Sequence, residues 1–387
     1  MSIKLANRMG ELAPYLFAEL DRKKVQAQAR GMDVISLTIG DPDLPTPPEI
    51  VRAGQAAMAD PKNHRYPDYA GSKAFRSAAA LWMKRRFGVE LDPDSEVVAL
   101  IGSKEGIAHL PMALVNPGEV VLCPEPGYPV YATLTRMVGG QVHDMPLLAE
   151  NGFLPDLEAI PAAVVQRTKA LWINYPNNPT AALAPQAFLE KAVAFAQKNQ
   201  CVLCVDAAYS EMAFDNLRVP SILEIPGARD VAIEFHSLSK TYNMTGWRVG
   251  FAVGNREVVG ALGRLKNNLD SGVFTAVQEA AIAAMALWPG HLPELLGTYR
   301  KRRDVLCDAL EKAGYQPYRP QATFYVWMPV PSGDDVGFAS RLIEQAGVMV
   351  TPGSGFGPSG KGYVRFALTA PEIRLAEAVE RIRKAGV

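Results

Sequence analysis

The central part of the chain alternates short apolar runs with segments of helix length. Between residues 95 and 255 these runs are VVALIG, VVLCP, QVHDMPL, ALWIN, CVLCVD, VAIEFHS and GFAVG. Near-continuous apolar runs are typical of strands buried on both faces, and their alternation with helices indicates a parallel sheet between two helical layers. We therefore predict an α/β fold whose large domain is built on a mostly parallel seven-stranded sheet.

The two ends of the chain show a different pattern. Residues 1–45 contain a helical run, LFAELDRKKVQAQA, followed by the turn-rich segment GDPDLPTPP. Residues 290–387 show the pattern of helix, strand, helix, strands and helix, with ATFYVWMPV and YVRFAL as strands. We predict a large domain over residues 46–285 and a smaller α+β domain formed jointly by residues 1–45 and 286–387.

Composition and charge narrow the class of protein. The chain carries 40 basic and 40 acidic side chains, so it lacks the basic surface of a nucleic-acid binder. Its longest apolar stretch, AAIAAMALW (residues 280–288), is too short to cross a membrane and fits a core helix. The N-terminal segment lacks the apolar core of a secretory signal. We expect a cytoplasmic enzyme that binds small molecules, with neither nucleic acid nor membrane as a partner.

Neither the cysteines nor the histidines have the spacing of a metal site. Cys201 and Cys204 are spaced as CxxC, but they lie in a predicted strand, where residues three apart face opposite ways. The five histidines show no ligand spacing, and we expect no metal. Residues 355–360, GFGPSG, match the dinucleotide pattern GxGxxG, but a strand follows where that pattern requires a helix. We predict a glycine loop there, without a nucleotide site.

The segment SLSKTYNMTGWRVG (residues 237–250) contains the strongest candidate for catalysis. Lys240 follows an apolar strand in a loop of small polar residues, where a lysine has no packing role. A Schiff-base lysine needs its amine at the carboxyl end of a strand, near other cations or partly desolvated, so that the neutral form is accessible. Ser237 and Arg248 flank Lys240 with a hydroxyl and a guanidinium suited to a phosphate dianion. The alternative is a solvated surface lysine, which these neighbours disfavour.

Three further polar residues follow predicted strands. Asp206 closes the run CVLCVD, Tyr209 lies three residues beyond it, and Asn178 follows ALWIN. An anionic Asp206 can hold a pyridine nitrogen protonated, and a protonated pyridine ring stabilises a carbanion at the substrate Cα. Tyr209 and Asn178 can both reach the phenolic oxygen of such a ring. For Asp206 alone, capping of the next helix is an equally good interpretation.

Three more candidates come from separate segments. In IGSKEGIAHL a helix starts around Ser103, and its free backbone N–H groups can bind phosphate, although an ordinary N-cap serine is the alternative. Tyr128 in PEPGYPVY is a candidate for stacking on the ring of a bound aromatic cofactor. The alternative is a tyrosine in a proline turn. Arg365 lies in the otherwise apolar strand YVRFAL, where it needs an anion, and its planar fork suits a substrate α-carboxylate.

Together these motifs make the chain similar to the class I and II aminotransferases among the fold type I pyridoxal-phosphate enzymes, over essentially its whole length. The resemblance implies that Lys240 of S-x-S-K carries pyridoxal 5'-phosphate and acts as the catalytic base, with Asp206 and Tyr209 as catalytic partners. Tyr128 and Asn178 are then further cofactor contacts. The implied phosphate ligands are Ser103, Lys104, Ser237 and Arg248.

The resemblance also implies how the substrate is bound. Arg365 and the backbone of Gly40 are expected to hold its α-carboxylate. Tyr66 in RYPDYAG resembles a tyrosine that reaches the phosphate of the neighbouring subunit, which implies a homodimer with shared active sites. The other substrate candidates are Tyr15, Tyr69, Lys104, Asn178 and Asn268, with Tyr69 and Asn268 as candidates from the partner subunit. Lys104 is placed to meet a distal carboxylate, the alternative being contact with the cofactor phosphate alone.

Within the family, several segments are most similar to the members that transaminate LL-diaminopimelate with 2-oxoglutarate in lysine biosynthesis. The segments are PYLFAELDRKK, IGSKEGIAHL, FHSLSKTYNMTGWRVGFAVGN, NNLDSGVFTAVQEAAIAA and ATFYVWMPVP. Ala70 and Ala181 depart from the YEG and NNPTG of several such relatives. The alternatives are an alanine-, aspartate- or aromatic-type aminotransferase, or a β-lyase that expels a group from Cβ. A non-enzymatic regulator on this fold is a third class, but we expect no DNA-binding domain ahead of the first motif.

Overall fold

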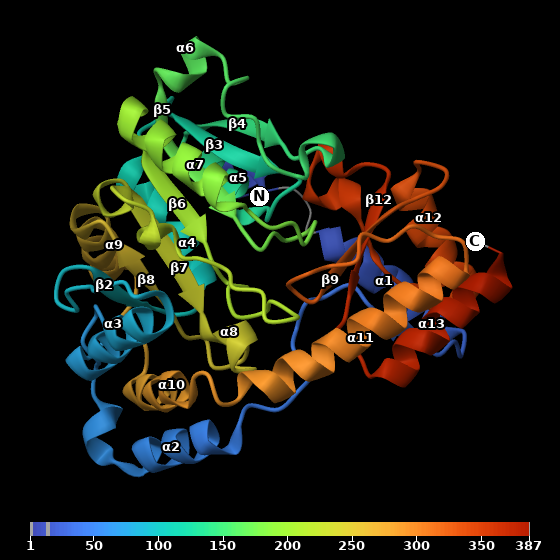
Figure 1. Cartoon of the computed structure of the whole chain (residues 1–387), viewed down its shortest axis with the longest axis horizontal. Coiled ribbons are helices and arrows are strands. Elements are labelled where there is room, and N and C mark those ends of the chain that lie inside the picture. Colours follow the sequence, from blue (N-terminus) through green and yellow to red (C-terminus); the bar gives the residue numbers. More distant parts are fainter. Residues whose placement is uncertain (1–2, 13–15, 387) are drawn as a thin grey trace.

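The computed structural model describes residues 3–12 and 16–386, with residue 11 and residues 16–20 as backbone only. A seven-stranded sheet forms the larger part of the molecule, and a smaller part lies beside it (Figure 1). The strand order is β2-β8-β7-β6-β5-β3-β4. In this sheet β8 runs in the direction opposite to the other six strands. The strands are β2 (Val97–Leu100), β3 (Val120–Glu125), β4 (Gln141–Pro146), β5 (Thr168–Asn174), β6 (Val202–Asp206), β7 (Ala232–Ser237) and β8 (Gly250–Gly254). The predicted mostly parallel seven-stranded sheet is thus confirmed.

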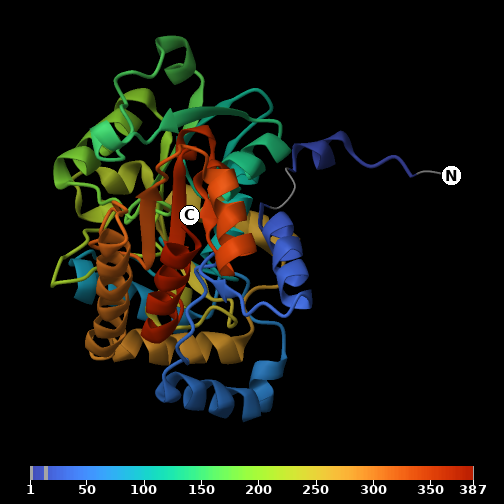
Figure 2. The same cartoon turned by 90° about the vertical axis from the view of Figure 1, so that its right-hand side faces the viewer.

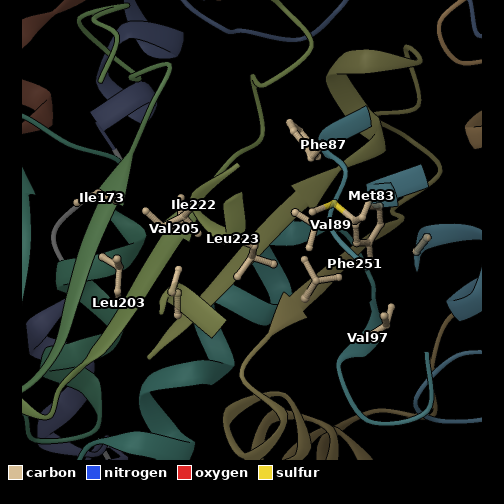
Figure 3. Close-up of a cluster of buried hydrophobic side chains, with 14 of the residues drawn as sticks. Met83, Phe87, Val89, Val97, Ile173, Leu203, Val205, Ile222, Leu223 and Phe251 are labelled. Atoms are coloured by element: carbon tan, nitrogen blue, oxygen red, sulfur yellow. The ribbon is translucent and has the colours of Figure 1, made fainter. Parts of the chain in front are cut away.

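Helices cover both faces of this sheet and bury a separate core on each. Because successive side chains of a strand point to opposite faces, Ile173 of β5 enters one core and Trp172 the other. In the first core, Met83 of the covering helix α3 lies near Phe251 of β8 (Figure 3). Its helices are α2 (Pro48–Ala59), α3 (Lys73–Phe87), α7 (Gln186–Asn199) and α10 (Thr275–Leu287). The helices of the second core are α4 (Ser103–Leu114), α5 (Val130–Met137) and α9 (Arg256–Leu269).

The smaller part brings the two ends of the chain into one core. Ile35 of β1 aligns with Val348 of β10, and both are buried in that core. Its strands are β1 (Ile35–Ser36), β9 (Tyr325–Pro329), β10 (Val348–Met349), β11 (Thr351–Pro352) and β12 (Tyr363–Ala367). Its helices are α1 (Leu16–Ala29), α11 (Leu292–Lys312), α12 (Asp335–Arg341) and α13 (Glu372–Ala385). The domain boundaries at residues 46 and 285 remain a prediction.

The termini and the most apolar helix complete the outline. Figure 2 shows residues 3–6 extending away from the body of the molecule, and the 3₁₀ turn that follows them, Asn7–Glu11, contacts α5. The stretch AAIAAMALW lies mostly in α10, where Ala280 and Ala284 are fully buried against the large sheet's core. Among the described residues, no helix combines the length and apolar character that a membrane crossing needs.

Parallel strands place their carboxyl ends at one edge of the sheet, where doubly wound folds bind their ligands. At this edge lie the last residues of β5, β6 and β7, which are Asn174, Asp206 and Ser237. Ser237 also caps the short helix α8 (Leu238–Thr241), because its Oγ accepts a hydrogen bond from Ser239 N at 3.2 Å. This cap directs the chain so that Lys240 follows directly at the same edge.

Ala181, where several similar sequences have glycine, adopts an unusual backbone conformation. Its φ is 60°, in the left-handed region, and its side chain is buried at 5% exposure. The turn is held by a hydrogen bond from Ala181 N to Asn177 O at 2.9 Å. In this region the Cβ of an L-residue is crowded by the following carbonyl, at a cost of about 1–2 kcal/mol. The departure from glycine therefore leaves local strain close to Asn178.

We expect Ala181→Gly to raise the free energy of unfolding by about 1 kcal/mol, because glycine adopts a positive φ without this crowding. The neighbouring Ala182→Gly is the matched control and should lower it by about 0.5–1 kcal/mol or more, through backbone entropy and the loss of a partly buried methyl group. Urea denaturation of both cofactor-free variants measures the difference. Destabilisation by Ala181→Gly would contradict strain at this turn.

Candidate active site

A pocket of about 660 Å³ opens at the carboxyl edge of the large sheet, where β9 and β12 of the smaller part approach it. Most of the predicted site residues line this one cavity. They are Gly40, Ser103, Lys104, Tyr128, Asn178, Asp206, Tyr209, Ser237, Lys240, Arg248 and Arg365. Tyr66, Tyr69 and Asn268 are not among its lining residues, and Tyr15 lies outside the described residues.

The amine of Lys240 sits in a desolvated and partly cationic environment. Its Nζ donates a hydrogen bond to Gly40 O at 2.7 Å. Burial lowers the pKa of Lys240 from 10.5 to about 8, and the positive charges of Arg248 and Arg365 act in the same direction, while Asp41 opposes them. A substantial fraction of the amine is therefore neutral near pH 7 to 8, as a nucleophile or base requires.

Gly40 is held in a space that excludes any side chain. An added Cβ would overlap the Tyr325 hydroxyl and lie 2.7 Å from Cε2 of Phe324. The carbonyl of Gly40 can therefore approach the Lys240 amine, and the segment that carries it is fixed against β9. A larger residue would displace both the aromatic rings and this carbonyl.

Asp206 is a buried carboxylate that faces the pocket with two protein donors. Its Oδ2 accepts a hydrogen bond from the Tyr131 hydroxyl at 2.7 Å, and Oδ1 accepts one from Ala208 N at 3.2 Å. Burial raises the pKa of Asp206, and these hydrogen bonds act in the opposite direction. A cationic ring nitrogen placed against the carboxylate would favour its ionised form further.

A turn and a helix N-terminus form a cradle for an anion. Ser103 begins α4 after Gly102, whose φ of 74° is easy for glycine alone. A Cβ on Gly102 would overlap Nη2 of Arg248, so the turn passes directly against that guanidinium. Free N–H groups of α4, the Arg248 charge and the Ser237 hydroxyl thus converge on one side of the pocket. The arrangement suits the phosphate of pyridoxal phosphate.

A buried ion network supports this cradle from behind. Glu105 accepts hydrogen bonds from Ile101 N at 3.0 Å and from Nζ of the fully buried Lys266 at 2.8 Å, which ties the turn together. Nδ1 of His109 lies 2.6 Å from the same carboxylate, and Lys266 also pairs with Asp270 at 3.0 Å. Among the described residues, Glu105, His109 and Asp270 form the one group of His, Cys, Asp or Glu close enough to share a metal ion. The Lys266 ammonium supplies the positive charge in this group.

Arg365 enters the pocket from β12 and is 3% exposed. Its Nη1 donates to Oδ1 of Asn178 and its Nη2 to Thr38 O, each at 2.6 Å. The guanidinium carbon lies 4.1 Å from the centre of the Tyr325 ring and 4.7 Å from that of Phe356. Two aromatic rings and two oxygens therefore set the orientation of the guanidinium, and Asn178 connects it to the large sheet.

Several residues of the site escaped the sequence analysis. Tyr131 of α5 is buried behind the pocket, where it donates to Asp206, and in the sequence it is an ordinary apolar-face aromatic. Asn174 ends a predicted strand; its Nδ2 donates to Asp206 O at 2.7 Å, and its Oδ1 accepts from the Asn178 backbone. Tyr325, which lies in ATFYVWMPV, has its hydroxyl 3.0 Å from that of Tyr209. For Tyr325 and for Phe356 the sequence shows only aromatic residues of an apolar segment.

The residues expected to meet a partner subunit lie on the surface. Tyr66 is 83% exposed and Tyr69 is 41% exposed, while Asn268 is exposed at the end of α9. The loop that carries Tyr69 is adjacent to the loop that follows α9, because a Cβ on Gly272 would lie 3.0 Å from Asp68 O. These side chains form no part of the pocket of their own chain.

The fold and the pocket define the class of protein, a fold type I pyridoxal-phosphate enzyme. A parallel sheet presents at its carboxyl edge an amine of lowered pKa, a buried carboxylate and an anion cradle. The chain belongs to the aminotransferases, because residues 32–382 match the family described as Aminotransferase class I and II. It is therefore an enzyme that uses pyridoxal phosphate to act on amino acids and 2-oxo acids.

Individual relatives cover the whole chain. The LL-diaminopimelate aminotransferase of Desulforudis audaxviator is 56% identical over 384 residues, 99% of this chain and 98% of its own. The LL-diaminopimelate aminotransferase of Syntrophobacter fumaroxidans is 54% identical over 385 residues, 99% of each chain. Among solved structures, apo-BacF from Bacillus subtilis superposes with a TM-score of 0.96 at 38% identity, covering 100% of this chain and 99% of that one.

We expect the cofactor-free protein to capture pyridoxal, the analogue without the phosphate, at a rate that rises with pH and reaches half its plateau near pH 8. Only the neutral Lys240 amine attacks the aldehyde, and its pKa is lowered to about 8. Stopped-flow absorbance across this range measures the midpoint. Omitting the phosphate removes a second titration, which lies near pH 6. A midpoint near 10.5, the ordinary lysine value, would show that the amine is solvated.

Proposed function

We propose that this aminotransferase moves an amino group between LL-diaminopimelate and 2-oxoglutarate, giving tetrahydrodipicolinate and glutamate in lysine biosynthesis. The observation that carries the proposal is the joint placement of Lys240 and Arg365 in one cavity of about 660 Å³. That volume is within the range of about 300–1,000 Å³ typical of small-molecule sites. Two full-length relatives with this named activity, at 56% and 54% identity, support the choice of substrate.

In this proposal the substrate is held at both ends. Arg365 binds the α-carboxylate with its planar fork, and the backbone of Gly40 adds a contact to the same group. Lys104 lines the pocket with an exposed side chain, so its ammonium is available for a distal carboxylate. Both amino donors, LL-diaminopimelate and glutamate, have such a distal group, and alanine does not.

Cofactor residues then hold and tune the reacting centre. Ser103, the backbone N–H of Lys104, Ser237 and Arg248 would bind the phosphate, and Tyr128 would stack on the ring. Asp206 holds the proton on the pyridine nitrogen, with Tyr131 keeping its carboxylate in place. Bound pyridoxal phosphate supplies the electron sink for the electron pair left at the substrate Cα.

Proton transfer falls to Lys240, with two residues beside it on the phenolic oxygen. Tyr209 and Asn178 would donate to that oxygen when the cofactor is bound. The Lys240 Nζ would remove the substrate Cα proton and hold it for return, and the same amine would act in the reverse sense in the second half-reaction.

We also propose that the enzyme is a cytoplasmic homodimer. The exposed Tyr66, Tyr69 and Asn268 would then serve the neighbouring site, as the family resemblance implies. The extended N-terminal segment supports a partner surface, because Ile3 and Leu5 are 88% and 68% exposed (Figure 2). All four cysteines are free and buried, which suits a reducing compartment.

Purified protein should transaminate LL-diaminopimelate with 2-oxoglutarate at a higher kcat/KM than alanine, aspartate, phenylalanine or cystathionine. Lys240→Ala should lower kcat by many orders of magnitude, because no other group can return the Cα proton. Glutamate formation and loss of the Schiff-base absorbance are the two measurements. A higher kcat/KM for a rival amino acid would reassign the substrate. Oxo-acid release without any amino acceptor would indicate a β-lyase.

Arg365→Lys should lower kcat/KM by thirty-fold or more for every α-amino acid, since a point charge replaces a bidentate fork at a cost on the order of 2–4 kcal/mol. Lys104→Ala is the comparison: it should raise KM roughly tenfold for LL-diaminopimelate and glutamate and leave alanine almost unchanged. Steady-state kinetics with all three substrates separate the two ends of the site. The control substrate is an amine without a carboxylate. If Arg365→Lys lowered kcat/KM for this amine as much as for alanine, Arg365 would lie outside the carboxylate site.

A further inference from the structure

The glycine loop GFGPSG has a role that the dinucleotide pattern does not explain. It belongs to the connection between β11 and β12, which makes two 3₁₀ turns at Gly353–Phe356 and Pro358–Gly360. Phe356 lines the pocket and packs with Leu147, Phe153 and Trp327 in a small apolar cluster. That cluster joins residues that follow β4 of the large sheet to β9 of the smaller part. The loop therefore bridges the two parts at the mouth of the site.

Glu125, the last residue of β3, holds this loop from the large sheet. Its Oε1 accepts a hydrogen bond from Ser359 N at 2.7 Å, and its Oε2 accepts one from Ser359 Oγ at 2.5 Å. A third hydrogen bond, from Gly127 N to Phe356 O at 3.0 Å, runs in parallel. Burial raises the pKa of Glu125, and the bonds from Ser359 act against that shift. Release of the loop would leave the 7% exposed carboxylate without these donors, which is costly.

The loop fits the carboxylate closely at Gly357. This residue has a φ of 130°, which L side chains rarely adopt. An added Cβ would overlap Glu125 Oε1 and lie 2.6 Å from its Cγ. Glycine is thus the residue that lets the backbone lie flat on Glu125 while Ser359 reaches around it.

The loop held by Glu125 contacts the Arg365 end of the pocket through the ring of Phe356. The Phe356 ring centre lies 4.7 Å from the guanidinium carbon of Arg365, and Phe356 is 8% exposed. A cation beside an aromatic ring in a desolvated site gains attraction that depends on the position of the ring. The ring also keeps water from that side of the guanidinium, which strengthens its pairing with a carboxylate.

We propose that Glu125 is a positioning residue for substrate binding: by clamping Ser359 and Gly357 it keeps Phe356 against Arg365 and so sets the affinity for the substrate α-carboxylate. This rests on the proposed role of Arg365 in binding that carboxylate. Glu125 itself touches neither substrate nor cofactor in this scheme. Loss of Glu125 should therefore raise KM for every substrate with an α-carboxylate, whatever its distal group.

Steady-state kinetics of the cofactor-loaded enzyme test the clamp. Glu125→Ala should raise KM about tenfold for both LL-diaminopimelate and alanine, with kcat within about threefold of wild type. Glu125→Gln keeps an acceptor for Ser359 N and should restore most of the wild-type KM. Glu96→Ala is the matched control, since Glu96 is a 4% exposed carboxylate paired with Arg229 before β2, and it should leave KM unchanged.

A double variant tests whether Glu125 acts through Phe356. Phe356→Ala alone should raise KM at least as much as Glu125→Ala, and the two together should raise it no further, because the second change removes nothing that remains. Additive effects would overturn the proposed route through Phe356.

Hydrogen exchange of the loop supplies a measurement that needs no turnover. In Glu125→Ala the amides of residues 353–360 should exchange about tenfold faster or more than in wild type, and in Glu96→Ala they should not. Unchanged exchange, or faster exchange with an unchanged KM, would overturn the clamp. A wild-type enzyme that accepts no α-amino acid would instead overturn the proposed function, while the exchange data still report on the loop.

Discussion

The burial of a parallel sheet on both faces is the constraint from which the site follows. Strand interiors between two helical layers accept apolar side chains almost exclusively, as Trp172 and Ile173 of β5 illustrate. The polar residues inside β7, Glu234 and His236, are paired with each other at 2.6 Å. Polar groups that remain available to a ligand lie where the strands end. Because parallel strands end at the same edge, Asn174, Asp206 and Ser237 are brought together without any further device. The short helix after Ser237 then places Lys240 among them.

Bringing charges to that edge has an electrostatic cost, which nearby neutral groups and other charges offset. Burial in the pocket lowers the pKa of Lys240, with a smaller contribution from two nearby guanidinium groups, so its neutral form becomes accessible. Asp206 is stabilised by the Tyr131 hydroxyl and a backbone amide. Arg365 is oriented by Asn178 and the carbonyl of Thr38. The same low dielectric that makes these groups costly to bury makes them effective on a charged ligand.

The sequence predicted the structure well at positions where a residue type has a single plausible structural or chemical role. Apolar runs located all seven strands of the large sheet, and Lys240 among small polar residues after one of them located the pocket. The expectation of a loop there was wrong, because the Ser237 cap starts the short helix α8. Tyr131 and Phe356 could not be separated from ordinary core aromatics, because their roles depend on which distant segment they face. Tyr66 and Tyr69 lie on the surface, so the resemblance alone assigns them a role, and that assignment stays a prediction.

In the proposed function, chemistry and recognition are divided between the two parts of the molecule. Asp206 ends β6 of the large sheet and Lys240 lies in α8 beside it, whereas Arg365 belongs to β12 of the smaller part. Of the groups that orient this guanidinium, Asn178 accepts a hydrogen bond from it across the boundary. Any shift of the smaller part would therefore move the carboxylate site relative to the reacting amine. In the proposed scheme, contacts across this boundary, including that of Glu125 with Ser359, therefore affect substrate affinity without touching the substrate.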